Sequence, residues 1–286
     1  MIRTTLRRLV MGLSTVLGFG QRGFFIPYRY AAGIKPAGER PAYDAVEAHF
    51  VAEEDTFERL IEAIDSLAVD LRSIGFESPP APRWDQSWFP RADAAAAYAM
   101  VRALKPKRII EVGSGHSTRF LARAVKDGTL ETHITAIDPA PRAGIGELGV
   151  ETIPTTLQDA DPAIFATLQS GDFLFIDSSH ILMPGTDVDI LFNRILPTLP
   201  SGVLIHIHDI FLPDDYPKNW DWRGYNEQLA VSTLILGNAY EVLWSSRYAT
   251  TRMAERLDAS ALGRIPMPDE ALESSLWLRK KSGNDA

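Results

Sequence analysis

Residues 108–120 read RIIEVGSGHSTRF and decide the fold that the sequence predicts. Ile109, Ile110 and Val112 form an apolar, β-branched strand, and an acid and two glycines lead from it into a helix. Glycine allows the tight reversal, and the free N–H groups of the helix then face whatever lies above the strand end. The stretch is typical of a nucleotide-binding turn.

The turn departs from the dinucleotide fingerprint GxGxxG, because Thr118 stands where the third glycine is expected. Glu111 is the acid next to the turn, where it could hold a cation or an amine and would repel a pyrophosphate. The simpler alternative is an ordinary strand-to-helix turn with a surface glutamate.

Composition narrows the class of protein. A chain of 286 residues, 45% of them apolar, fits one large domain or one domain with an appendage. The net charge of -8 and the lack of a basic patch argue against a nucleic-acid partner. With no cysteine, the chain has no disulfide, no thiolate metal site and no cysteine nucleophile, which fits a cytoplasmic location.

The first thirty residues combine a basic start with a mildly apolar run, as the first two regions of a signal peptide do. Glycines interrupt the run, Arg22 follows it, the cleavage site is poor, and it is too short for an integral membrane span. We expect an N-terminal arm that packs on the domain or on a partner such as a second copy in a homodimer. Peripheral membrane contact through Arg3, Arg7, Arg8 and the apolar face is the second reading.

Residues 43–74 carry apolar side chains at helical spacing, so one helix face is expected to be buried on the core or on a second subunit. The proline-rich segment 77–93 ends this helix. We therefore predict an N-terminal arm and amphipathic helix over 1–80 and a catalytic domain over 81–286. Trp84 and Trp88 could line a pocket, although aromatic residues beside a linker more often fix it in place.

The rest of the chain alternates between apolar strands and helices. Strands are predicted at 109–112, 133–137, 150–154, 173–177, 203–209, 240–244 and 275–279, and helices at 94–104, 118–126, 162–168, 186–196 and 226–236. This alternation indicates an α/β fold whose mostly parallel sheet has helices on both faces. The last strand follows a long excursion over 247–272, which suits antiparallel insertion.

Four acids follow this pattern at the carboxyl ends of strands: Glu111, Asp138, Asp177 and Asp209. In open α/β sheets, ligands bind beyond these ends. Four acids along one edge form a constellation that chance explains poorly.

These residues resemble the class I S-adenosylmethionine-dependent methyltransferases over about residues 89–279. EVGSG is similar to their first motif, AIDP to the second, and FIDSSH and HIHDIF to the fourth and fifth strands. FIDSSH and HIHDIF further resemble a bacterial branch related to catechol-type O-methyltransferases. The resemblance implies a Rossmann-like, seven-stranded sheet whose last strand is antiparallel.

The resemblance also implies cofactor contacts. Asp138 would bind the ribose diol, as it would in a nicotinamide cofactor, and Ser117 would bind the methionyl carboxylate. The turn of Gly113, Ser114 and Gly115 would lie against the methionyl group, with Glu111 near its ammonium. Asp159 would meet the adenine amine or, with equal weight, cap the following helix.

Methyl transfer requires an aligned and deprotonated nucleophile. Asp177, His208 and Asp209 could hold Mg²⁺ or another divalent metal that lowers the pKa of an acceptor hydroxyl. His208-Asp209 replaces the Asp-Asn pair of the catechol-type pattern, which leaves room for a softer metal or none.

Without a metal, His208 or His180 is the general base. His206 is expected to be packed or hydrogen-bonded, and His116 to contact the cofactor or cap its helix. The aromatic segment 211–225 is expected to form the acceptor wall or lid through Tyr216, Trp220, Trp222 and Tyr225, with self-packing for about half of them.

The sequence thus predicts an S-adenosylmethionine-dependent methyltransferase acting on an oxygen of a small-molecule or glycan-like acceptor. The alternatives are a nicotinamide-dependent oxidoreductase and a non-catalytic methyltransferase-like subunit that binds a partner through the 43–74 helix.

Overall fold

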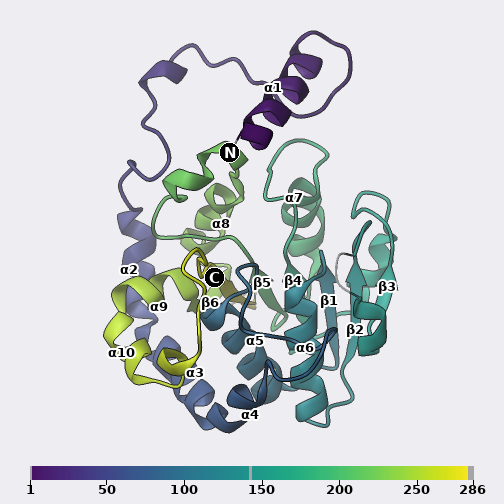
Figure 1. Cartoon of the computed structure of the whole chain (residues 1–286), viewed down its shortest axis with the longest axis vertical. Coiled ribbons are helices and arrows are strands. Elements are labelled where there is room, and N and C mark those ends of the chain that lie inside the picture. The colour runs from purple at the N-terminus through teal and green to yellow at the C-terminus, as the bar shows by residue number, and fades with distance from the viewer. Residues whose placement is uncertain (1, 142–143, 283–286) are drawn as a thin grey trace. The chain divides into compact units, whose positions relative to one another are not determined.

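A computed structural model describes residues 2–141 and 144–282 and divides the chain into two compact units (Figure 1). The first unit ends at Pro36 and contains α1 (Ile2–Val16) and a 3₁₀ turn (Ala31–Gly33). The second unit begins at Ala37, whereas the sequence analysis placed the boundary at 80/81. None of the described helices is both long enough and apolar enough to cross a membrane.

The second unit is built on a seven-stranded sheet with the order β3-β2-β1-β4-β5-β7-β6. Its β7 is antiparallel to both β5 and β6, and the remaining neighbours are parallel, which confirms the predicted Rossmann-like sheet. The strands are β1 (Arg108–Val112), β2 (His133–Ile137), β3 (Glu151–Ile153), β4 (Phe173–Ile176), β5 (Leu204–Ile207), β6 (Tyr240–Ser245) and β7 (Leu276–Lys280).

The central strands are buried on both faces. All four residues of β4 are buried, as its continuous apolar run predicts, and so are all four of β5, although His206 interrupts its apolar run. From β1 the chain first builds β2 and β3 on one side and then returns to place β4 on the other. Beyond the carboxyl ends of β1 and β4 lies the switch point at which such sheets bind ligands.

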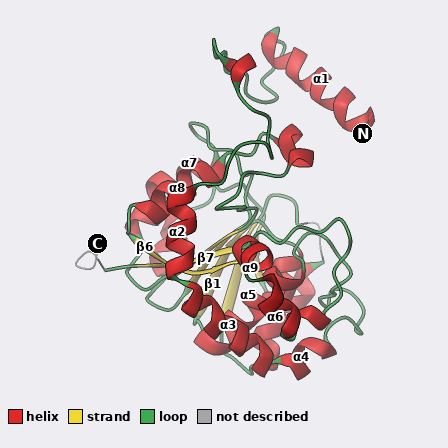
Figure 2. Ribbon diagram, turned by 90° about the vertical axis from the view of Figure 1, so that its left-hand side faces the viewer, coloured by secondary structure: helices red, strands yellow, loops and turns green. Residues whose placement is uncertain are grey.

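Helices cover the sheet on both faces; α3, α5 and α6 gather on one side and α7 and α8 on the other (Figure 2). The alanine run of α5 is fully buried, and its small side chains let α5 pack closely on α6. The helices of this unit are α2 (Asp44–Ala52), α3 (Glu54–Ser66), α4 (Ala68–Ser73), α5 (Arg91–Leu104), α6 (His116–Asp127), α7 (Asp187–Ile190), α8 (Glu227–Leu236), α9 (Ser246–Arg252) and α10 (Ala254–Ala259). Short 3₁₀ turns span Ile145–Leu148, Pro162–Thr167, Leu196–Thr198, Lys218–Arg223 and Leu262–Arg264, and a π-helical turn spans Leu191–Ile195.

Three predicted helices differ in detail. The helix over 43–74 is three helices, because the backbone leaves helical geometry at Glu53, amid three acids, and again at Leu67. The helix over 162–168 is a 3₁₀ turn, and the one over 186–196 becomes α7 followed by the π-helical turn. The apolar face of α3 is buried in the core of its own unit, where α3 packs on α5 and β6.

Candidate functional site

Gly113 brings the turn after β1 against the end of β4. Its φ is +88°, and a Cβ atom there would lie 2.1 Å from the carbonyl oxygen of Asp177. Its N–H donates to the Ile137 carbonyl of β2 at 2.9 Å. Only glycine allows this close approach, which joins the ends of β1, β2 and β4 at one edge.

Glu111 lies beneath this turn and is fully buried. The hydroxyls of Ser117 and Thr118 each donate to its carboxylate at 2.6 Å, and Thr118 Oγ1 also accepts the Gly115 N–H at 3.0 Å. Burial raises the pKa of Glu111 to about 8, although the two hydroxyl donors oppose this shift. Glu111 and Ser117 therefore fix the start of α6. Thr118, which stands in place of the third glycine, contributes to the same hydrogen-bond network.

Asp138 follows β2 and is half-buried at the same edge. Ser114 Oγ donates to its Oδ2 at 2.7 Å, and the Ala140 N–H donates to its Oδ1 at 2.8 Å. Each oxygen keeps a lone pair, so the carboxylate is fixed in place and can still accept hydroxyl hydrogen bonds.

Asp159 is exposed and accepts a hydrogen bond from Thr156 Oγ1 at 2.9 Å. The alternative that Asp159 caps the following helix is wrong. Asp161 is the N-cap of the Pro162–Thr167 turn, because its carboxylate accepts the Ala163 N–H at 2.9 Å.

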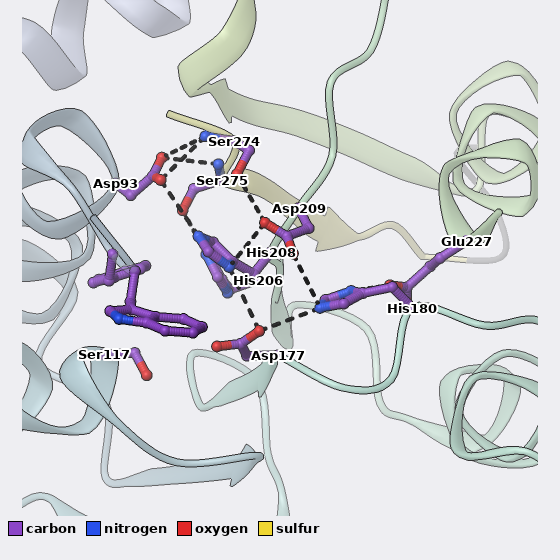
Figure 3. Close-up of polar contacts among 12 residues, drawn as sticks. Asp93, Ser117, Asp177, His180, His206, His208, Asp209, Glu227, Ser274 and Ser275 are labelled. Atoms are coloured by element: carbon purple, nitrogen blue, oxygen red, sulfur yellow. Dashed lines mark hydrogen bonds and ion pairs between the residues drawn. The ribbon is translucent and has the colours of Figure 1, made fainter. Parts of the chain in front are cut away.

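Beyond β4 and β5, two imidazoles and two carboxylates contact one another (Figure 3). His208 Nδ1 lies 3.5 Å from both Asp177 Oδ1 and Asp209 Oδ1, and its Nε2 lies 3.4 Å from Asp93 Oδ2. His180 Nε2 lies 3.4 Å from Asp177 Oδ1 and 3.3 Å from Asp209 Oδ2. The four predicted catalytic residues thus form one network, in which Asp177 has the most exposed side chain at 34%.

The backbone of this network is strained. His180 and Asp209 have φ values of +60° and +55°, in the left-handed region that non-glycine residues seldom adopt. The carbonyl of His180 accepts N–H groups from Asn226 and Glu227, which holds this geometry. Such strain concentrates at functional sites.

Carboxylates control the charge of both imidazoles. Burial by itself would lower the pKa of His180, but hydrogen bonds to Asp177 and Glu227 outweigh it and hold that pKa well above the usual value. The pKa of His208 is raised against burial in the same way, chiefly by the charges of Asp209 and Asp177. Burial favours a raised pKa for Asp177, but the two histidines hold it well below the ordinary value. The resting site therefore contains imidazolium–carboxylate pairs.

The structure does not support the predicted metal site of Asp177, His208 and Asp209. Within residues 2–141 and 144–282, no group of three or more histidine and acidic side chains is arranged to hold a metal. Both ring nitrogens of His208 and of His180 face carboxylates at 2.9–3.5 Å, so these imidazoles are already engaged in pairs within the protein.

Sequence reasoning missed four residues that support the histidines. Asp93 of α5 is fully buried and accepts the N–H groups of Ser274 and Ser275 at 3.0 and 2.8 Å, while Glu227 Oε2 lies 2.9 Å from His180 Nδ1. Two signals in the sequence were available: Asp93 directly precedes four alanines, and Glu227 stands at the start of an apolar helix. Their partners lie far away in the sequence, so no local spacing identified them.

The remaining predicted aromatic and histidine contacts are packing contacts. His206 stacks on Phe175 with ring centroids 3.6 Å apart, and its Nε2 lies 2.8 Å from Ser275 Oγ, which confirms the packed interpretation. Trp84 fixes its segment in place, since its ring packs on Phe120 at 4.9 Å and its Nε1 donates to the Leu71 carbonyl.

Segment 211–225 packs largely on itself. Tyr216 is buried, and the Trp220 ring packs on Phe211 at 5.0 Å and on Tyr225 at 6.0 Å. Trp222 is 46% exposed. Tyr225 also contacts the His180 ring at 4.7 Å, so this segment borders the imidazole network.

Residues 110–210 match a family model described as a methyltransferase domain. This segment is about a third of the chain, runs from β1 to just beyond β5, and contains all four strand-end acids and both imidazoles of the network. Among proteins with curated functions, none matches the sequence.

Several solved structures are similar to this chain. A methyltransferase of Podospora anserina bound to SAH is 18% identical, with 91% of this chain and 100% of that chain covered and a TM-score of 0.42. An O-methyltransferase of Bacillus cereus in complex with SAH is 12% identical, with 82% and 100% covered and a TM-score of 0.42.

Proposed function

We propose that the protein is an S-adenosylmethionine-dependent methyltransferase. The observation that carries this proposal is the convergence of Glu111, Asp138, Asp177 and Asp209 along one sheet edge, inside the segment that matches a methyltransferase domain. Bound S-adenosylmethionine would supply a methyl group activated by its sulfonium charge.

The residues present fit this cofactor. Asp138 is a fixed, half-buried carboxylate suited to a ribose diol. The position of a Cβ on Gly115 meets no atom within 4 Å, so the turn has open space beside it for the methionyl part. Glu111 would act through Ser117 and Thr118 by holding the turn and α6 in position.

The acceptor atom in this proposal is the oxygen of a small-molecule or glycan-like hydroxyl. The hydroxyl would approach the network beside Asp177, its most exposed acid. A neutral His208 or His180 would accept the hydrogen bond of that hydroxyl and take its proton, which also orients the attacking oxygen. Asp209 and Asp177 would stabilise the imidazolium that forms, as carboxylates beside a catalytic histidine do.

A transfer assay tests the proposal. The full chain is mixed with methyl-labelled S-adenosylmethionine and a panel of phenols and sugars, beside the variants His208→Asn and His180→Asn. We expect label transfer by the wild type and a loss of at least about a hundredfold in the variant that lacks the base. If both variants retain wild-type turnover, neither imidazole is the base.

A nicotinamide-dependent oxidoreductase fits less well, because Thr118 and buried Glu111 occupy the places where a dinucleotide turn needs glycine and no acid. The non-catalytic subunit is disfavoured as well. The α3 face that it would offer to a partner already packs in the core of its own unit.

A further inference from the structure

Three basic side chains gather at the start of α6: Arg83, His116 and Arg119. We propose that they form a binding site for an oxyanion, that is, a carboxylate, phosphate or sulfate group, beside the methyl-transfer site. The assignment of that anion to cofactor or acceptor rests on the proposed function, whereas the anion site itself does not.

Packing brings the three residues together. The Trp84 ring packs on the Phe120 ring at 4.9 Å, which brings the neighbouring Arg83 to the start of α6 near Arg119. His116 precedes Arg119 by three residues, so the two lie on one face of the helix. The positive end of the helix dipole adds to the same field.

Arg119 has no counter-ion among the described residues. Its side chain is buried to 8% exposure, it makes no hydrogen bond or ion pair in the described part of the chain, and its Nε is buried without a partner. The Nδ1 of His116 is likewise buried and unpartnered. Burial and the charge of Arg83 lower the pKa of Arg119, and burial lowers the pKa of His116 to about 4. Because an unpaired buried cation is costly, an anion is the component that would complete this cluster.

The cluster adjoins the proposed transfer site. Phe89 packs on Phe120 at 6.3 Å and on His208 at 5.4 Å, so one aromatic side chain links α6 to the imidazole network. Gly113, three residues before His116, lies against Asp177. The oxyanion could therefore be the methionyl carboxylate of the cofactor or an acidic group of the acceptor.

The first test uses inorganic sulfate as the probe and Arg119→Met as the variant. Sulfate should raise the melting temperature of the wild type and should not do so for Arg119→Met. Without anion, the Arg119→Met variant should be at least as stable as the wild type. If Arg119 had a structural role instead, the variant would be less stable than the wild type. Arg123→Met is the matched control, because Arg123 is on the same helix but pairs with Asp127 and Glu77. Equal sulfate stabilisation of all three proteins would overturn the site.

The second test identifies the source of the anion. It also uses the variant Arg83→Gln, because Arg83 is exposed and its replacement should leave the fold intact even if Arg119→Met does not fold. If the cofactor supplies the carboxylate, the variants bind S-adenosylhomocysteine about tenfold or more weakly but bind its decarboxylated analogue as the wild type does. If the acceptor supplies the anion, KM rises for acidic acceptors alone. Wild-type protein that binds sulfate but no S-adenosylhomocysteine would refute the proposed function and leave the anion site standing. Unchanged sulfate response in both variants refutes the site.

The N-terminal unit carries an independent second inference. Its basic residues are Arg3, Arg7, Arg8, Arg22, Arg29 and Lys35, and all 37 acidic residues of the chain lie after residue 36. On α1, large apolar side chains recur at helical spacing, and Leu6, Leu9, Leu13 and Val16 are each more than half exposed. Arg7 and Arg8 lie outside this apolar stripe.

We infer that α1 lies in the surface of an anionic membrane, with its apolar stripe inserted and its arginines at the lipid head groups. The test is co-sedimentation of the full chain with phosphatidylcholine vesicles, with and without phosphatidylglycerol. Binding should require the anionic lipid, weaken with salt and disappear in Leu9→Asp/Leu13→Asp. The control Leu229→Asp, at a position of α8 that is 50% exposed, should bind as the wild type does. Equal vesicle binding by the two variants would overturn the inference. A change in oligomeric state in Leu9→Asp/Leu13→Asp would also overturn it, because the apolar stripe would then be an interface between copies of the chain.

Discussion

Replacing Gly113 with alanine should damage both stability and cofactor binding. The added Cβ would lie 2.1 Å from the Asp177 carbonyl oxygen, where contacts below 3.0 Å are essentially never seen, so the two segments must separate. A φ of +88° costs an L-residue about 1–2 kcal/mol. Separation also weakens the hydrogen bond from the Asp177 N–H to the Val112 carbonyl, worth about 0.5–1.5 kcal/mol.

The expected loss in the free energy of unfolding is therefore about 1.5–3.5 kcal/mol, measured by urea denaturation. Isothermal titration should show weaker binding of S-adenosylhomocysteine, since the turn moves away from Asp177. Gly115→Ala is the control for stability, because its Cβ meets no atom within 4 Å. Gly113→Ala with wild-type stability and affinity would refute the proposed role of the close approach.

Three further predictions follow from the charges of the site. Because the base must be neutral and its pKa is raised, turnover should increase with pH through that raised pKa and level off above it; a pH-independent rate in the wild type would contradict this. The folded state keeps a proton on Glu111 up to about pH 8 that the unfolded chain releases near 4.5, so the free energy of unfolding should fall as pH rises between these values, and Glu111→Gln should flatten the curve measured by denaturation. Glu227→Gln should lower the pKa of His180, measured by NMR titration, and should reduce the free energy of unfolding by about 1.5–3 kcal/mol. The control Glu241→Gln, in a partly exposed pair, should cost less than about 1 kcal/mol, and equal losses would count against a stabilising role of the buried pair.

The sheet could be predicted from the sequence because its central strands are buried on both faces. Runs such as Phe173–Ile176 have no polar residue to suggest any other structure. Once the strands are assigned, the topology of a parallel sheet places the acids that follow them at one edge. Helix limits were harder to predict. The apolar period continues across the break at Glu53, so the period alone does not locate it.

The site could be predicted only in part. Asp177, His180, His208 and Asp209 adjoin strands, so their convergence follows from the fold. The contacts of His208 with Asp93 and of His180 with Glu227 join distant elements, and no sequence spacing encodes them. The metal prediction was not supported because the same carboxylates are paired with imidazoles, which a linear motif cannot reveal.

The most direct measurement is isothermal titration of the full chain with S-adenosylhomocysteine, with NAD in a parallel titration. We predict one binding site per chain for the sulfur nucleoside, a large loss of affinity in Asp138→Ala, and no binding of NAD. No heat from S-adenosylhomocysteine with folded protein, or saturable binding of NAD in its place, would contradict the assignment of the sheet edge to a sulfonium nucleoside.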